Sequence, residues 1–85
     1  MRTVKENKKA KNKIKFLGLW KSYEKQRAYF ITDPSYRFLD FIFIDKKNGI
    51  GSFKINNQYR VKIIKNSSDL YTVFDVGDFH RRQKK

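Results

Sequence analysis

Residues 59–65 read Tyr-Arg-Val-Lys-Ile-Ile-Lys. Tyr59, Val61 and Ile63 fall at every second position, as apolar residues do when one face of a β-strand is buried. The residues between them include two cations, so the opposite face is expected to meet solvent. The same period of two recurs along most of the chain after residue 13 and predicts a β-rich fold. We expect five or six strands, at Ile14 to Lys21, Arg27 to Thr32, Phe38 to Asp45, Ile50 to Ile55, Tyr59 to Lys65 and Leu70 to Val76.

The segments between these strands carry residues that favour turns. Asn48-Gly49 is the strongest hairpin signal, and the single proline, Pro34, lies in a loop where its missing N–H costs no sheet hydrogen bond. Short strands on so small a chain bury a core most economically by curling, so we predict an all-β, five-stranded OB-like barrel. An SH3-like barrel is an alternative. A mixed α+β domain follows instead if Leu19 to Ala28 is helical, where Trp20, Tyr23 and Arg27 show helical spacing.

The composition narrows the class of protein. The sequence has 85 residues, no cysteine and one histidine, so neither a disulfide framework nor a metal site is expected, and no cofactor is predicted. No apolar run approaches the roughly 18 residues that cross a bilayer, so we expect no membrane association. The absence of cysteine fits a cytoplasmic location.

The net charge of +13 is unevenly distributed. Residues 1–15 hold seven of the 21 Lys and Arg side chains, and residues 80–85 hold four. Segments this polar and like-charged bury little apolar surface. We therefore predict a disordered basic tail over residues 1–13, a single β-barrel domain over residues 14–79 and a basic tail over residues 80–85. Both tails are expected to bind a polyanion in a salt-dependent way.

Residues 20–31 read Trp-Lys-Ser-Tyr-Glu-Lys-Gln-Arg-Ala-Tyr-Phe-Ile, which resembles the first hairpin of a cold-shock domain. In that family a Trp, a Glu-Lys turn and an RNP1-type strand follow one another, and Trp20, Glu24-Lys25 and Tyr29 stand at matching positions. Residues 40–45, Asp-Phe-Ile-Phe-Ile-Asp, resemble the RNP2-type strand. Gln26, Arg27 and Asp45 depart from the pattern. The resemblance implies an OB-fold that binds single-stranded nucleic acid.

Aromatic and basic side chains on one barrel face would serve that function, because rings stack on bases and cations contact phosphates. Phe41 and Phe43 lie on this face only if Ile42 and Ile44 point inward; the reverse alternation places both rings in the core. The candidate nucleic-acid-binding residues are Trp20, Lys21, Lys25, Arg27, Tyr29, Phe41, Phe43 and Lys54.

No catalytic constellation is recognisable in the sequence. The lone histidine, His80, falls in the predicted C-terminal tail, and no phosphate-binding loop motif occurs. We therefore expect a nucleic-acid-binding protein that is not an enzyme, with single-stranded DNA or RNA as its partner. The alternative is a small protein-interaction module that docks on a larger acidic protein.

Overall fold

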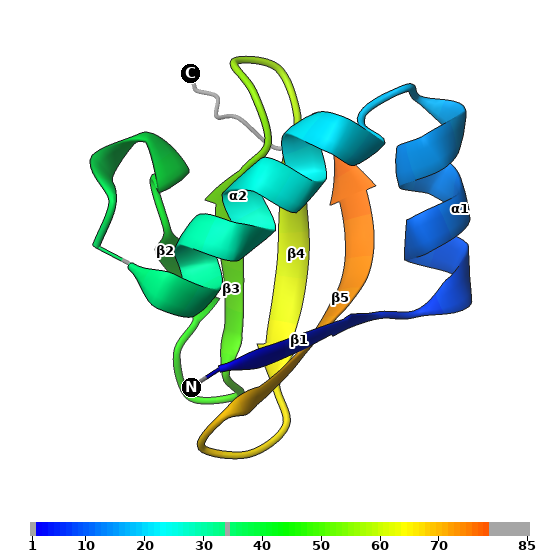
Figure 1. The fold of residues 1–85 in the computed structure, drawn as a ribbon. Helices are drawn as coiled ribbons and strands as arrows, with labels where there is room; N and C mark the ends of the chain where they lie inside the picture. Colours follow the sequence, from blue (N-terminus) through cyan, green and yellow to red (C-terminus); the bar gives the residue numbers. More distant parts are fainter. Residues whose placement is uncertain (1, 34, 79–85) are drawn as a thin grey trace, which may run out of the picture.

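The computed structural model describes residues 2–33 and 35–78, and within them the chain forms helices as well as strands (Figure 1). The elements in chain order are β1 (Thr3–Glu6), α1 (Lys8–Phe16), α2 (Trp20–Thr32), the 3-10 helix η1 (Arg37–Leu39), β2 (Ile42–Asp45), β3 (Ile50–Lys54), β4 (Arg60–Lys65) and β5 (Leu70–Gly77).

The strands form one sheet in the order β1-β5-β4-β3-β2. β1 runs parallel to β5, and the other neighbours are antiparallel. Both helices cover the same face of this sheet (Figure 1). The core lies between the two layers, where Tyr23 and Phe30 of α2 stack on Phe53 of β3 at ring distances of 6.3 and 5.3 Å.

The predicted all-β barrel is wrong. The sheet stays open, with β1 and β2 as its edges, and the fold is α+β. The segments predicted as strands at 14–21 and 27–32 belong to helices, α2 holding residues 20–32. Four α2-side residues are buried at spacings of four, three and four, which is one face of a helix: Leu19, Tyr23, Gln26 and Phe30. The polar Gln26 interrupts the apolar stripe, so the helical period is weak in the sequence.

The segment predicted as a disordered N-terminal tail is also folded, because it supplies β1 and α1. α1 begins with Asn7, whose side-chain oxygen accepts a hydrogen bond from the Ala10 N–H at 2.8 Å. Only Ala10 and Ile14 of α1 are buried, and its lysines stay at the surface. Two inward apolar residues are enough to dock a helix whose remaining side chains, mostly lysines, are exposed. The predicted tail at 80–85 and its His80 lie outside the described residues.

The four strands predicted after residue 37 are present as β2 to β5, but the first is shorter than predicted, because residues 37–39 form η1 and only Ile42–Asp45 of the expected strand Phe38 to Asp45 is extended. The hairpin expected at Asn48-Gly49 joins β2 to β3, and Gly49 has the positive φ of 72° that a tight turn requires there. Gly51 is a position of close approach, because a Cβ added to it would lie 2.8 Å from the Phe41 ring. Within the described residues, none of the helices has the length and apolar character needed to cross a membrane.

Candidate functional site

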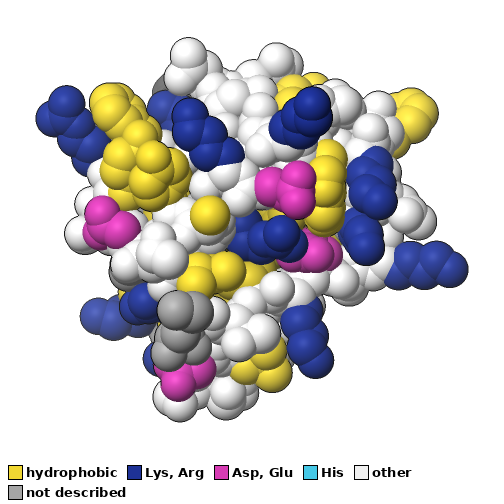
Figure 2. Space-filling view, viewed as in Figure 1, with side chains coloured by type: hydrophobic (Ala, Val, Ile, Leu, Met, Phe, Trp, Pro, Cys, Tyr) yellow, Lys and Arg dark blue, Asp and Glu magenta, His cyan; other side chains and the backbone are white. Residues whose placement is uncertain are grey.

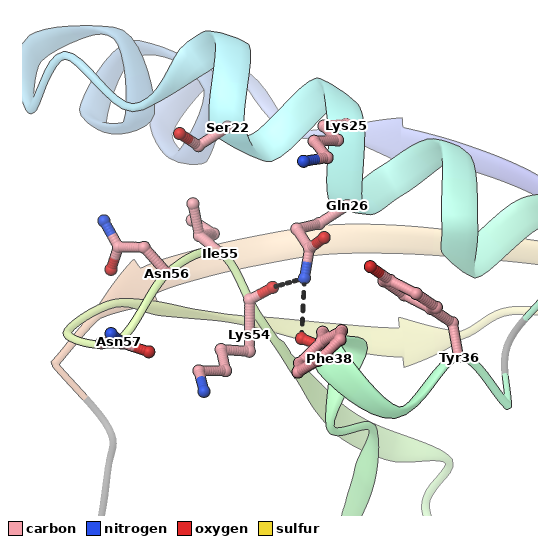
Figure 3. Close-up of a pocket in the computed structure, with 9 residues that line it drawn as sticks. All are labelled: Ser22, Lys25, Gln26, Tyr36, Phe38, Lys54, Ile55, Asn56 and Asn57. Carbon is pink, nitrogen blue, oxygen red and sulfur yellow. Dashed lines mark hydrogen bonds between the residues drawn. The ribbon is translucent and has the colours of Figure 1, made fainter.

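A cavity of about 360 Å³ opens between α2, the segment around η1 and the connection from β3 to β4 (Figure 3). Its lining is polar and aromatic, and includes two of the lysines selected from the sequence. The lining residues are Ser22, Lys25, Gln26, Tyr36, Phe38, Lys54, Ile55, Asn56 and Asn57.

Gln26 fixes the floor of this cavity. Its side-chain amide donates hydrogen bonds to the Phe38 carbonyl at 3.0 Å and the Lys54 carbonyl at 2.9 Å (Figure 3). The residue is only 7 % exposed, and a buried amide must find such partners to offset its lost hydration. One side chain of α2 therefore ties η1 to the end of β3.

The rings of Tyr36 and Phe38 form one wall of the cavity, which we call the aromatic wall. Tyr36 stacks on Tyr29 of α2, with 3.8 Å between ring centroids, and Phe38 meets Tyr36 edge-on at 5.6 Å. Phe38 is 57 % exposed, and the Arg37 guanidinium lies over its ring at 5.1 Å. The wall thus presents an accessible ring beside a cation, which suits stacking on a nucleobase.

Lys25 of α2 and Lys54 of β3 both line this cavity, one from the helix layer and one from the sheet (Figure 3). Because two lysines and two asparagines belong to the same lining, the cavity suits an anion with hydrogen-bonding substituents. A phosphodiester attached to a stacked base has this chemistry. Among the described residues, no cluster of His, Asp or Glu is suited to hold a metal ion.

A second polar network lies beside Lys54, because Arg60 is its cross-strand partner in the β3–β4 ladder. Arg60 donates to the Ser52 hydroxyl from Nε at 2.8 Å and to the Asp40 carboxylate from Nη1 at 2.8 Å. Its Nη2 donates to the backbone carbonyls of Asp40 and, at 3.2 Å, Ser52. Arg60 is 3 % exposed, so the expectation that it faces solvent is wrong.

Asp40 has a left-handed backbone with φ of 48°, a conformation that costs energy in most residues but less in Asp. Arg60 holds the residue in place through both its carboxylate and its carbonyl. Gln26 and Arg60 therefore anchor the segment around η1 from two sides, and this segment carries the aromatic wall.

Arg27, also selected from the sequence, belongs to a different network. Its Nη1 donates to the Glu6 carboxylate at 2.8 Å, and the Tyr23 hydroxyl donates to the same oxygen at 2.6 Å. Burial, and secondarily the hydrogen bond to Glu6, raises the pKa of Tyr23 well above its usual value. The arrangement joins β1 to α2.

The remaining selected residues lie apart from the cavity or in its supporting layer. Trp20 is half-buried, with the cations of Lys15 at 5.2 Å and Arg27 at 5.7 Å from its ring. Lys21 is exposed on α2. Phe41 packs on Phe30 at 5.4 Å. Phe43 is 49 % exposed on β2. Phe41 and Phe43 contact each other edge-on, with 5.1 Å between ring centroids, but Trp20 and Tyr29 belong to α2 and have other ring partners, so the four rings do not form the single platform expected from the sequence.

Sequence reasoning missed Gln26 as a buried anchor, and it missed Tyr36, Phe38, Asp40 and Arg60. Tyr36 and Phe38 are aromatic residues that follow the turn at Asp33, which is a detectable signal. Asp40 and Arg60 carry no local signal, because their pairing joins segments 20 residues apart.

The fold places the chain in a class of small α+β proteins with known structures. No family model and no curated protein matches the sequence. Three solved structures share the fold over nearly their whole length.

A complex of RelE and RelB from the archaeon Pyrococcus horikoshii is similar with a TM-score of 0.74 and 15 % identity, covering 95 % of this chain and 98 % of that chain. YafQ from Escherichia coli gives a TM-score of 0.71 at 9 % identity, covering 93 % and 94 %. A YoeB–YefM complex from Staphylococcus aureus gives 0.67 at 10 % identity, covering 95 % and 99 %.

These likenesses correct three expectations. The fold is that of RelE, YafQ and YoeB and not the OB-fold of a cold-shock domain, so the suggested resemblance was wrong. The function inferred from it, binding of single-stranded nucleic acid by a barrel face, falls with it. The expectation that the chain is not an enzyme is corrected as well, because the fold is the one shared with RelE, YafQ and YoeB.

Proposed function

We propose that this chain cleaves RNA, as a small endoribonuclease of the RelE, YafQ and YoeB kind. The observation that carries the proposal is the extent of the structural match, with a TM-score of 0.74 over 95 % of this chain and 98 % of the RelE chain. Neither chain leaves a large segment unmatched, so the two share the whole fold, and this supports the proposal. The cytoplasm, where mRNA is translated, is the compartment in which this activity would operate.

The cavity beside α2 supplies groups that such a reaction needs. When RNA is cleaved through its own 2′-hydroxyl, that oxygen loses a proton and bonds to the adjacent phosphorus. The bond from phosphorus to the 5′ oxygen then breaks, and that oxygen takes up a proton. Negative charge builds on the phosphoryl oxygens in between, and positioned cations stabilise it. In our proposal Lys25 and Lys54 are these cations, and Phe38 stacks on a neighbouring base.

Cleavage of an mRNA in a cell-free translation reaction tests this function. We expect new 5′ ends, mapped by primer extension, when the purified chain is added. The double variant Lys25→Ala, Lys54→Ala should slow their appearance roughly tenfold or more, as loss of charge-stabilising groups does elsewhere. Its matched control removes two exposed lysines outside the cavity, Lys47→Ala with Lys65→Ala, and should cleave at the wild-type rate. An mRNA that stays intact with the folded wild-type chain refutes the proposed activity.

We also propose a protein partner, as RelE has in its complex with RelB and YoeB in its complex with YefM. The edge strand β2 favours this, because Ile42, Phe43 and Ile44 are each about half exposed. Figure 2 shows hydrophobic side chains at the surface where the chain between α2 and β2 lies. An edge strand offers unpaired backbone groups, so the fitting ligand is an extended apolar segment that adds a strand. The net charge of +13 selects an acidic partner.

A further inference from the structure

α1 presents a row of three lysines on one side of the helix. Lys8, Lys11 and Lys15 follow one another at spacings of three and four, so they share a face, and all three are exposed. We call this row the lysine stripe. Among the described residues the three form no ion pair, whereas Lys13 on the neighbouring face lies 3.7 Å from the Asp75 carboxylate. The stripe thus keeps its positive charge available.

Trp20 of α2 orders part of this stripe. The ammonium groups of Lys11 and Lys15 lie 5.8 and 5.2 Å from its ring centroid, and the Arg27 guanidinium lies at 5.7 Å. Cation–π contacts of this kind restrict long side chains, so less conformational entropy remains to be lost when the cations bind a ligand. The ring itself is half-buried and covered by cations, so it offers little free area for a base to stack.

From this geometry we infer that the lysine stripe binds the sugar-phosphate backbone of a nucleic-acid double helix. Cations fixed along a rigid helix match phosphates fixed along a rigid strand. A single strand would bring its bases to the surface, and the stripe has no open aromatic ring to receive them. The helix contains no acidic residue to repel a polyanion.

The stripe is separate from the cavity. α1 packs on β5, whereas the cavity lies by β3 and η1 on the opposite side of the molecule (Figure 1). Figure 2 shows Lys and Arg side chains gathered where α1 lies. No residue is shared between the two surfaces, so one molecule can hold a double helix on α1 while the cavity is occupied. Binding at the stripe goes beyond the proposed cleavage and does not depend on it.

Salt dependence of duplex binding tests the inference. Each neutralised phosphate contributes about 0.9 to the slope of log affinity against log salt concentration for a double helix. The variant Lys8→Gln, Lys11→Gln, Lys15→Gln should lower that slope by about two to three and weaken binding roughly tenfold or more at low salt. The control Lys46→Gln, Lys47→Gln, Lys65→Gln removes the same charge elsewhere and should leave the slope near the wild-type value. Fluorescence anisotropy with blunt duplexes of RNA and of DNA gives both slopes.

Comparing the two duplexes shows which feature of the backbone is recognised. Tighter binding of duplex RNA indicates recognition of its helical geometry, and equal affinity for RNA and DNA indicates recognition of phosphate alone. Equal losses in both triple variants would overturn the inference, because they would reflect net charge only. Displacement of the duplex by polyglutamate at equal charge would overturn it in favour of an acidic protein ligand. The variant Lys25→Ala, Lys54→Ala should bind duplex normally, so failure of cleavage and failure of the stripe give different results.

Discussion

Arg60 holds Asp40 by two groups at once, the carboxylate and the backbone carbonyl. The guanidinium is almost fully buried, whereas the Asp40 side chain is 58 % exposed. The pair fixes the end of the segment that carries the aromatic wall. Arg60 is itself held in the sheet by hydrogen bonds to the hydroxyl and the backbone carbonyl of Ser52.

Arg60→Ala should therefore lower the free energy of unfolding by about 3–5 kcal/mol, because it leaves a cavity and removes the hydrogen-bond donors to the Ser52 hydroxyl and to the Asp40 and Ser52 carbonyls. Asp40→Asn keeps an oxygen acceptor and tolerates the left-handed backbone, so it should cost only about 1 kcal/mol. Urea unfolding measures both. Equal losses in the two variants would contradict the asymmetry of burial on which the prediction depends.

Replacing Asn7, which caps α1, and Asn12, which lies inside it, by alanine should change the stability of the protein in opposite directions. Asn7→Ala removes the oxygen that caps the helix and should destabilise the protein by about 1 kcal/mol. Asn12→Ala, at an exposed interior position of the same helix, replaces a poor helix former and should stabilise it by a few tenths of a kcal/mol. Thermal unfolding followed by circular dichroism compares them. Destabilisation of similar size in both would mean that the cap contributes nothing.

Alkaline pH should weaken the fold through Tyr23. Burial and the hydrogen bond to Glu6 raise the pKa of this phenol in the folded state above its unfolded value of about 10. Its contribution to stability is complete below that pH and is lost as the pH rises further, because the unfolded state then releases a proton that the folded state retains. Tyr23→Phe should remove part of the decline in unfolding free energy between pH 9 and 11 (roughly the range around the unfolded pKa). A wild-type curve that declines no more steeply than the variant's would refute this.

Replacement of Phe43 by lysine should affect association more than folding. Phe43 is about half exposed on the edge strand, so its replacement removes little apolar area from the core and should change the stability of the fold little. A charge on an edge strand discourages pairing with another strand. We expect the wild-type chain to self-associate through this edge at high concentration and Phe43→Lys to stay monomeric there, as measured by light scattering after size exclusion. Identical elution and mass for the two proteins would argue against an adhesive β2 edge.

The sequence pattern agreed with the structure most closely in β4 and β5, where much of the burial follows the period of two. Val61 and Ile63 face the helices in β4, as the period of two indicated. α2 was expected only as an alternative, over Leu19 to Ala28, because Gln26 stands in its buried stripe; α1 was not predicted because its inward face is only Ala10 and Ile14. A helix that buries few apolar residues is stable only through tertiary packing, so its sequence shows no strong helical period of apolar residues.

The candidate site was predictable only in part. Lys25 and Lys54 were selected as phosphate-binding residues, and the fold brings both to one cavity, although by a helix and a strand and not by two strands. Arg60 was assigned to solvent because the alternation of β4 says nothing of Asp40, which covers it from another segment. Partners supplied by distant segments are invisible to a periodicity argument.

The parallel pairing of β1 with β5 joins Thr3 to Leu70 and Glu6 to Val73. During synthesis, a chain that has reached only residue 69 has no strand on which residues 3–6 can dock. It must hold Val4 and the inner side of α1 uncovered until β5 is made. The native sheet therefore forms late and from sequence-distant parts, which slows folding. Until then the growing polypeptide is open to chaperones and proteases.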